Sequence, residues 1–146
     1  MLTSWTSPRF VLAAVFAGLL AVASPASAGD GVVYHIDDAS VQALKALRNI
    51  RNHLDAAPDT KIVVVTHSDG VDFLFEGAKE ARSGTEYTPL VSALKSAGVA
   101  FEVCEITMKR RRLEKERFIL DAEFTPSGVV RLTRLQTQDH YAYIKP

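Results

Sequence analysis

The hydrophobic pattern of this chain switches repeatedly between continuous apolar runs and apolar positions three to four residues apart. Residues 32–36 and 61–66 are continuous runs rich in valine and isoleucine, which indicate strands buried on both faces, as in a parallel sheet. Between these runs, helical spacing predicts a helix that begins after Asp37-Asp38 and extends to about residue 54. The apolar residues with that spacing are Ala43, Leu47, Ile50 and Leu54.

The rest of the chain continues this alternation of strands and helices. The pattern predicts helices over 71–78, 88–98 and 107–119 and after Ser127, and strands over 99–103, 122–124 and 141–144. The segment 71–75 is more apolar than one buried helical face requires, so it is a candidate interface between copies of the chain. Strands alternating with helices predict an α/β fold, a three-layer α/β/α sandwich around a five-stranded parallel sheet.

The N-terminal segment has the features of an export signal. Arg9 is followed by an apolar run over 10–23 and by Ala26-Ser27-Ala28, a small-x-small cleavage site. The run is shorter than the roughly 20 residues of a membrane span. We therefore expect a cleaved signal peptide over 1–28, a single domain over 29–146, and no membrane span after cleavage.

Charge and cysteine content exclude some classes of function and of cross-link. The chain has 17 basic and 17 acidic side chains, and without a basic surplus there is no electrostatic case for a nucleic-acid partner. Its one cysteine, Cys104, cannot form an internal disulfide, so export into an oxidising compartment does not cross-link this fold. A lone cysteine in such a compartment is either buried or takes part in a reaction.

Candidate chemical groups follow the predicted strands. In open parallel sheets, ligands bind outside the carboxyl ends of the strands. His67 and Cys104 stand at two of these ends, with Thr107 shortly after. A cysteine before a helix N-terminus favours the thiolate form, yet a free cysteine at the end of a strand is also often simply buried.

Most of the other candidate residues allow two interpretations. His67 either caps a strand-to-helix turn or takes part in catalysis, whereas His35 is expected to be a hydrogen-bonded core histidine. The run over 110–112 is either a solvated helix face, neutralised by nearby Glu114 and Glu116, or a site for an anion or a partner. No CxxC or HxxxH spacing supports a metal site, so we expect none.

Four segments carry a resemblance to a known family: VVYHIDDASVQALKALRNIRNHLD, KIVVVTHSDGVDFLF, FEVCEITMKRRR and YAYIKP. Over 29–146 the chain resembles the DsrE/DsrF-like family, and more narrowly its short exported members in proteobacteria. The resemblance implies a DsrEFH-like α/β/α domain, assembly as trimers or hexamers, and, with the export signal, a periplasmic location.

The same resemblance implies a role for Cys104. In the cytoplasmic sulfur-trafficking members, a cysteine after the third strand accepts sulfur as a persulfide and passes it to a partner protein. Their pattern is valine-cysteine, five residues, then arginine, often with arginine-glycine next. Val103-Cys104 and Arg110-Arg111 match it, but Arg112 stands in place of the glycine, which leaves the local geometry open.

Two functions from different classes remain. In the first, the exported protein handles sulfur through Cys104 as a persulfide carrier or a sulfurtransferase-like protein, without a cofactor. His67 then hydrogen-bonds the thiolate or donates a proton, Thr107 and Arg110 bind the substrate, and a donor or acceptor protein is a partner. In the alternative, the protein is a non-catalytic oligomeric binding or scaffold protein with a structural cysteine. Whether there is catalytic turnover stays open.

Overall fold

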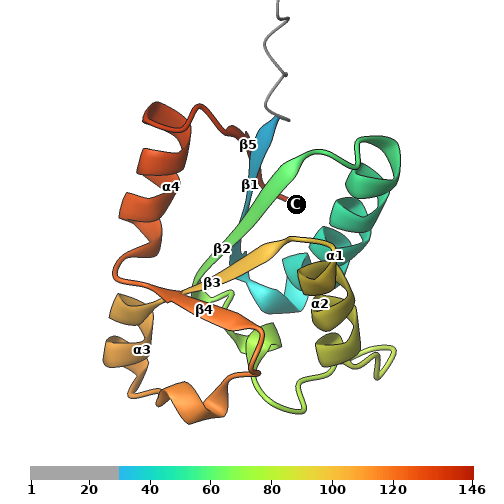
Figure 1. Ribbon diagram of the computed structural model, residues 1–146. Coiled ribbons are helices and arrows are strands. Elements are labelled where there is room, and N and C mark those ends of the chain that lie inside the picture. The colour runs from blue at the N-terminus through green and yellow to red at the C-terminus, as the bar shows by residue number, and fades with distance from the viewer. Residues whose placement is uncertain (1–29) are drawn as a thin grey trace, which may run out of the picture.

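A five-stranded parallel sheet forms the centre of this computed structural model, which describes residues 30–146 (Figure 1). The predicted signal peptide over 1–28 lies outside the described residues. The strands are β1 (Gly31–Asp38), β2 (Lys61–Asp69), β3 (Ala100–Cys104), β4 (Ala122–Thr125) and β5 (Ala142–Ile144), in the order β4-β3-β2-β1-β5 across the sheet. The α-helices are α1 (Ala39–Ala56), α2 (Tyr87–Ser96), α3 (Glu105–Arg111) and α4 (Gly128–Thr137).

Helices cover both faces of the sheet, which confirms the predicted three-layer α/β/α architecture. Figure 1 shows α1 and α2 on one side of the strands and α4 on the other. Asp38 caps α1 by accepting the N–H of Ser40, and Ser127 caps α4 by accepting the N–H of Val130, as N-terminal residues of this kind do. Within residues 30–146, no helix is both long and apolar enough to cross a membrane.

Alternation along each strand divides the side chains between two cores. The larger core, on the side of α1 and α2, holds one set of alternate strand residues, among them Tyr34, Val64 and Phe101. The smaller core lies beneath α4 and joins Val33 and Val65 to the helix. Because successive side chains of a strand point to opposite faces, every second residue that follows Val33 or Val65 also faces α4.

The predicted helix over 71–78 is wrong. Only a short 3-10 helix, Asp72–Leu74, forms there, and Phe75 then pairs with Phe118 in an antiparallel bridge. Val71 and Leu74 are fully buried inside the chain. The apolar excess of this segment therefore belongs to the core of one molecule, which removes the reason for placing an interface over 71–75.

The predicted helix over 107–119 is also wrong in extent. Helix α3 begins at Glu105 and ends at Arg111, and a separate 3-10 helix covers Lys115–Arg117. Arg112 ends α3 in the left-handed conformation, with φ 56° and ψ 47°, which normally favours glycine. The helix thus ends with glycine-like geometry although the chain has arginine at this position.

Candidate functional site

Cys104 is the last residue of β3 and immediately precedes α3. It is 4% exposed and, lying two residues after Glu102, faces α4 by the alternation of the strand. The first residue of α4 is Gly128, where an added Cβ would lie 3.3 Å from the Cβ of Cys104 and 3.4 Å from the Cβ of His67. The absence of a side chain at Gly128 lets the start of α4 approach both groups closely.

The surroundings of the Cys104 sulfur favour the thiolate. Burial raises the pKa of this thiol, but hydrogen bonds from the backbone N–H groups of Gly128 and Thr107 and from the Thr107 hydroxyl lower it by more. The N–H of Ile106 adds to the lowering. The net pKa of Cys104 lies below that of an ordinary thiol, because donors from two helix starts stabilise the negative sulfur.

Thr107 connects the thiol to the end of β2. Its side chain is 7% exposed, and its hydroxyl oxygen accepts the backbone N–H of Ser68 at 2.9 Å. The same hydroxyl lowers the pKa of Cys104 through a hydrogen bond to the sulfur. Thr107 therefore contacts the thiol, and its role in binding the substrate stays a prediction.

Arg110 lines a cavity of about 280 Å³ together with Thr107, Ser68, Asp69 and Arg111. The guanidinium of Arg111 is held by Asp72 at 2.6 Å and by the Ser68 carbonyl at 3.0 Å. Among the ion pairs within 30–146, none involves Arg110. The two arginines therefore differ in role. Arg111 links α3 to the end of β2, whereas the Arg110 guanidinium lines the cavity and forms no ion pair within residues 30–146.

His67 lies in a hydrogen-bonded row rather than on the sulfur. Its Nε2 is 2.7 Å from the Nε2 of His35, and its Nδ1 is 3.0 Å from the Ser68 hydroxyl. The Nδ1 of His35 is in turn 2.6 Å from the Tyr143 hydroxyl. His35 is 9% exposed, so the prediction of a hydrogen-bonded core histidine is confirmed. The catalytic role of His67 stays a prediction.

Both imidazoles of this row are predominantly neutral near pH 7. Burial lowers the pKa of His35, and the charge of His67 lowers it further. Burial also lowers the pKa of His67, whereas nearby Asp37 raises it. With both rings neutral, a single proton lies between the two Nε2 atoms, and one ring donates to the other.

A partly buried ion pair fixes α4 over β3. Glu102 is 7% exposed, and both its carboxylate oxygens accept hydrogen bonds from Arg131 at 2.8–3.1 Å. Glu102 precedes Cys104 by two residues on the same face, and Arg131 follows Gly128 by about one helical turn. The ion pair therefore fixes the part of α4 that brings the Gly128 N–H to the sulfur.

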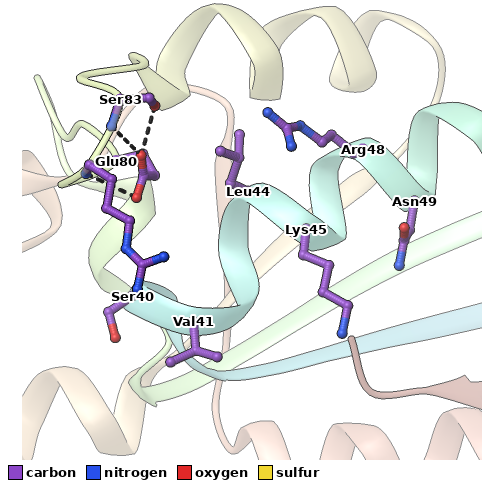
Figure 2. A pocket seen from close by; sticks show the side chains of 9 residues that line it. Ser40, Val41, Leu44, Lys45, Arg48, Asn49, Glu80 and Ser83 are labelled. Carbon is purple, nitrogen blue, oxygen red and sulfur yellow. Dashed lines mark hydrogen bonds between the residues drawn. The ribbon is translucent and has the colours of Figure 1, made fainter.

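A larger cavity, of about 440 Å³, lies elsewhere on the molecule. Figure 2 shows it between α1 and the loop that holds Glu80 and Ser83. Lys45 and Arg48 line it, and the carboxylate of Glu80 accepts hydrogen bonds from the N–H and hydroxyl of Ser83. None of the predicted site residues borders this cavity, so its size does not mark the site.

A metal centre has no support in the described part of the chain, where no three His, Cys, Asp or Glu side chains are grouped closely enough to hold an ion. The structure brings Cys104, Thr107 and His67 together at one edge of the sheet, with Arg110 at the adjoining cavity. Sequence reasoning missed Gly128 and Tyr143. The glycine directly after the capping Ser127 was the available signal for Gly128.

The fold and the site define a class of protein: a three-layer α/β domain that presents one thiol at the carboxyl edge of a parallel sheet. The DsrE/DsrF-like family matches residues 4–146, and the chain belongs to this family. This confirms the resemblance to the family, whereas the narrower likeness to its short exported members in proteobacteria stays a prediction. No curated protein matches the chain.

Two solved structures are similar to this one. The protein of unknown function MTH1491 from Methanobacterium thermoautotrophicum is 31% identical with a TM-score of 0.70, and the match covers 80% of this chain and 99% of that one. The ychN protein from E. coli is 14% identical with a TM-score of 0.65, over the same shares of the two chains. At that identity, the likeness to ychN supports the fold alone.

Proposed function

We propose that this protein is an exported sulfur carrier in which Cys104 holds the transferred sulfur as a persulfide. The observation that carries the proposal is the setting of the sulfur, where hydrogen bonds from Gly128 and Thr107 lower the thiol pKa despite burial. The thiolate is the form of cysteine that attacks another sulfur atom. Membership of a sulfur-relay family and the single cysteine of the chain support the same role.

The reaction is an exchange of sulfur–sulfur bonds. The Cys104 thiolate attacks a sulfane sulfur of the donor, a new bond joins Sγ to that sulfur, and the donor's S–S bond breaks. The electron pair leaves with the shortened donor, so Cys104 is oxidised and the donor is reduced. The N–H groups at the starts of α3 and α4 then stabilise the negative persulfide, as they stabilise the thiolate.

Thr107 and Arg110 bind the substrate in this proposal. Both line one cavity, and Thr107 also hydrogen-bonds the sulfur. The guanidinium of Arg110 attracts the negative charge of a polysulfide or thiosulfate to this cavity. His67 supplies a proton to the leaving sulfur. It does so through Ser68, which its Nδ1 contacts and which lines the same cavity.

Mass spectrometry of the intact protein tests the carrier role. The purified protein is incubated with polysulfide or with thiosulfate, and we expect a gain of one sulfur atom at Cys104 that a reductant removes. The Cys104→Ser variant is the matched control and gains nothing. Absence of the adduct in the wild type with both donors contradicts the proposal.

The 4% exposure of Cys104 favours the alternative, an oligomeric binding or scaffold protein in which the cysteine only packs. Labelling with a thiol reagent separates the two functions. A carrier thiol reacts in the native protein within minutes, whereas a packing thiol reacts only after denaturation. Labelling confined to the denatured protein would favour the scaffold.

Export and assembly are part of the same proposal. The signal peptide predicted over 1–28 is tested by expressing the full chain and determining the N-terminus of the exported product, which we expect at residue 29 in the periplasm. A trimer or hexamer is supported by exposed apolar residues beside the thiol, Ile106 at 51% and Val129 at 61%. Light scattering after size exclusion should give a multimer mass, and a monomer mass contradicts the assembly.

A further inference from the structure

A continuous row of hydrogen bonds crosses the sheet on the side of α4. It begins at the Tyr143 hydroxyl on β5, passes through both nitrogens of His35 on β1 and of His67 on β2, and ends at the Ser68 hydroxyl. The three contacts measure 2.6, 2.7 and 3.0 Å. These strands are neighbours in the sheet (Figure 1), so a row assembled from three strands bridges distant parts of the chain.

The two ends of the row have different surroundings. Tyr143 is 43% exposed, so this end of the row lies at the surface. Ser68, at the other end, lines the cavity that Thr107 and Arg110 also border. Between them His35 is 9% exposed and His67 is half-buried, so the middle of the row is less open to water than its ends.

Ser68 is exposed, yet it is held firmly at the cavity end of the row. Its φ of 51° lies in the left-handed region, which costs a non-glycine residue about 1 kcal/mol or more. Two contacts hold it there, because its N–H donates to the Thr107 hydroxyl at 2.9 Å and its carbonyl accepts from Arg111 at 3.0 Å. Strain sustained by specific contacts points to a functional position.

We infer that His35 and Tyr143 are positioning residues which, through His67 and Ser68, pass a proton from water to the sulfur that leaves during transfer. The inference rests on the proposed sulfur-carrier function. It assigns a role to two residues outside the predicted site, and it specifies a donor whose leaving group needs a proton, such as a hydropolysulfide.

Protons are conserved along the row during one sulfur transfer. At the start Tyr143 donates to His35, His35 Nε2–H donates to His67, and His67 Nδ1–H donates to Ser68. When the leaving sulfur takes the Ser68 proton, each proton behind it advances by one group, and Tyr143 recovers one from water. Every group ends neutral, and both imidazoles have exchanged tautomers. When the acceptor thiol later gives up its proton, the row runs in reverse and is restored.

The charges around the row are balanced. Burial is the main influence and lowers the pKa of both histidines, while Asp37 raises it and Lys145 lowers it. These two residues pair with each other at 2.7 Å, so their fields at the imidazoles largely cancel. The neutral, single-proton state of the histidine pair that the relay requires is therefore the ground state near pH 7.

Two substitutions interrupt the row while keeping its shape. His35→Gln retains groups that hydrogen-bond His67 and Tyr143, but an amide does not exchange tautomers as imidazole does. Tyr143→Phe removes only the hydroxyl. Tyr141→Phe is the matched control, because Tyr141 packs against the core beneath α4 and takes no part in the row.

Three measurements on the full chain test the relay. The rate of persulfide formation with hydropolysulfide should fall at least about tenfold in His35→Gln and Tyr143→Phe and stay unchanged in Tyr141→Phe. The ultraviolet titration of the thiolate should be unchanged in all three, because the row does not set the Cys104 pKa. Nitrogen chemical shifts should show both neutral tautomers at His67 in the wild type and a single one in Tyr143→Phe.

The outcomes separate this inference from the function on which it rests. No persulfide in the wild type overturns both. Persulfide formation at the wild-type rate in His35→Gln and Tyr143→Phe overturns the relay and leaves the carrier function standing. Equal slowing in Tyr141→Phe shows a packing defect and also overturns the relay.

Discussion

Thr107 allows a direct test of the thiolate site, because its hydroxyl supplies one of the hydrogen bonds that lower the Cys104 pKa. Thr107→Val replaces that hydroxyl by a methyl group in a side chain that is only 7% exposed. The thiolate loses one charge-assisted hydrogen bond, worth about 2 kcal/mol, and about 1.4 kcal/mol corresponds to one pKa unit. The N–H donors remain, and we expect the pKa of Cys104 to rise by about 1.4.

The assay is the ultraviolet absorbance of the thiolate as a function of pH, which does not require a reagent to reach the buried sulfur. Cys104→Ser provides the baseline, since tyrosine ionisation adds absorbance at high pH. Thr107→Ser retains the hydroxyl and should titrate like the wild type. If the midpoint is the same in the valine variant, the serine variant and the wild type, the hydroxyl does not stabilise the thiolate.

Three further substitutions and one control substitution test the stability of the structure around the site by denaturant unfolding. Glu102→Gln should lower the free energy of unfolding by about 2 kcal/mol, because it leaves a half-buried guanidinium without its carboxylate, whereas Glu123→Gln in a surface ion pair should cost under about 0.5 kcal/mol. Arg112→Gly should raise it by about 1 kcal/mol by relieving left-handed strain; no gain would contradict this. Hydrogen bonding to Lys145 lowers the Asp37 pKa to about 2, so Asp37→Asn should cost about 1 kcal/mol at neutral pH. That cost should vanish as the pH falls from about 4 toward 2, and one that persists at pH 2 would refute the assignment.

The sheet was predictable because its signals are local. Continuous aliphatic runs marked β1 and β2, and all five strands lie within a few residues of their predicted positions. The caps Asp38 and Ser127 were visible for the same reason, since each acts on the N–H groups of the next turn. These elements are determined by residues close together in the sequence.

The segment between β2 and α2 was not predictable in this way. Val71 and Leu74 have helical spacing, yet both are buried in a connection whose backbone is mostly irregular. Phe75 instead pairs with Phe118 from a distant part of the chain, and their rings lie 5.0 Å apart. Apolar spacing does not distinguish a helix from a buried connection when the partner is far away in the sequence.

In the candidate site, the sequence predicted which edge of the sheet holds the side chains but not which face of the sheet they occupy. Sequence order alone placed His67 and Cys104 at the carboxyl edge, because both end parallel strands. Which face each side chain takes depends on register, and in the structure Val65 pairs with Glu102. His67 and Cys104 each follow that pair by two residues, so both face α4, and Gly128 at the start of that helix contacts both.

Register also explains why the polar row can exist in a fold stabilised mainly by apolar burial. His35 follows Val33 by two residues, and Val33 pairs with Tyr143 across the β1–β5 boundary. His35 and His67 are therefore the first polar residues beyond a valine on the α4 face, and Tyr143 lies there at the level of Val33. A shift of one residue in any strand pairing would turn that strand's member toward α1 and break the row. The apolar core that fixes the register of β1 and β2 thus also determines the geometry of the chemistry at their ends.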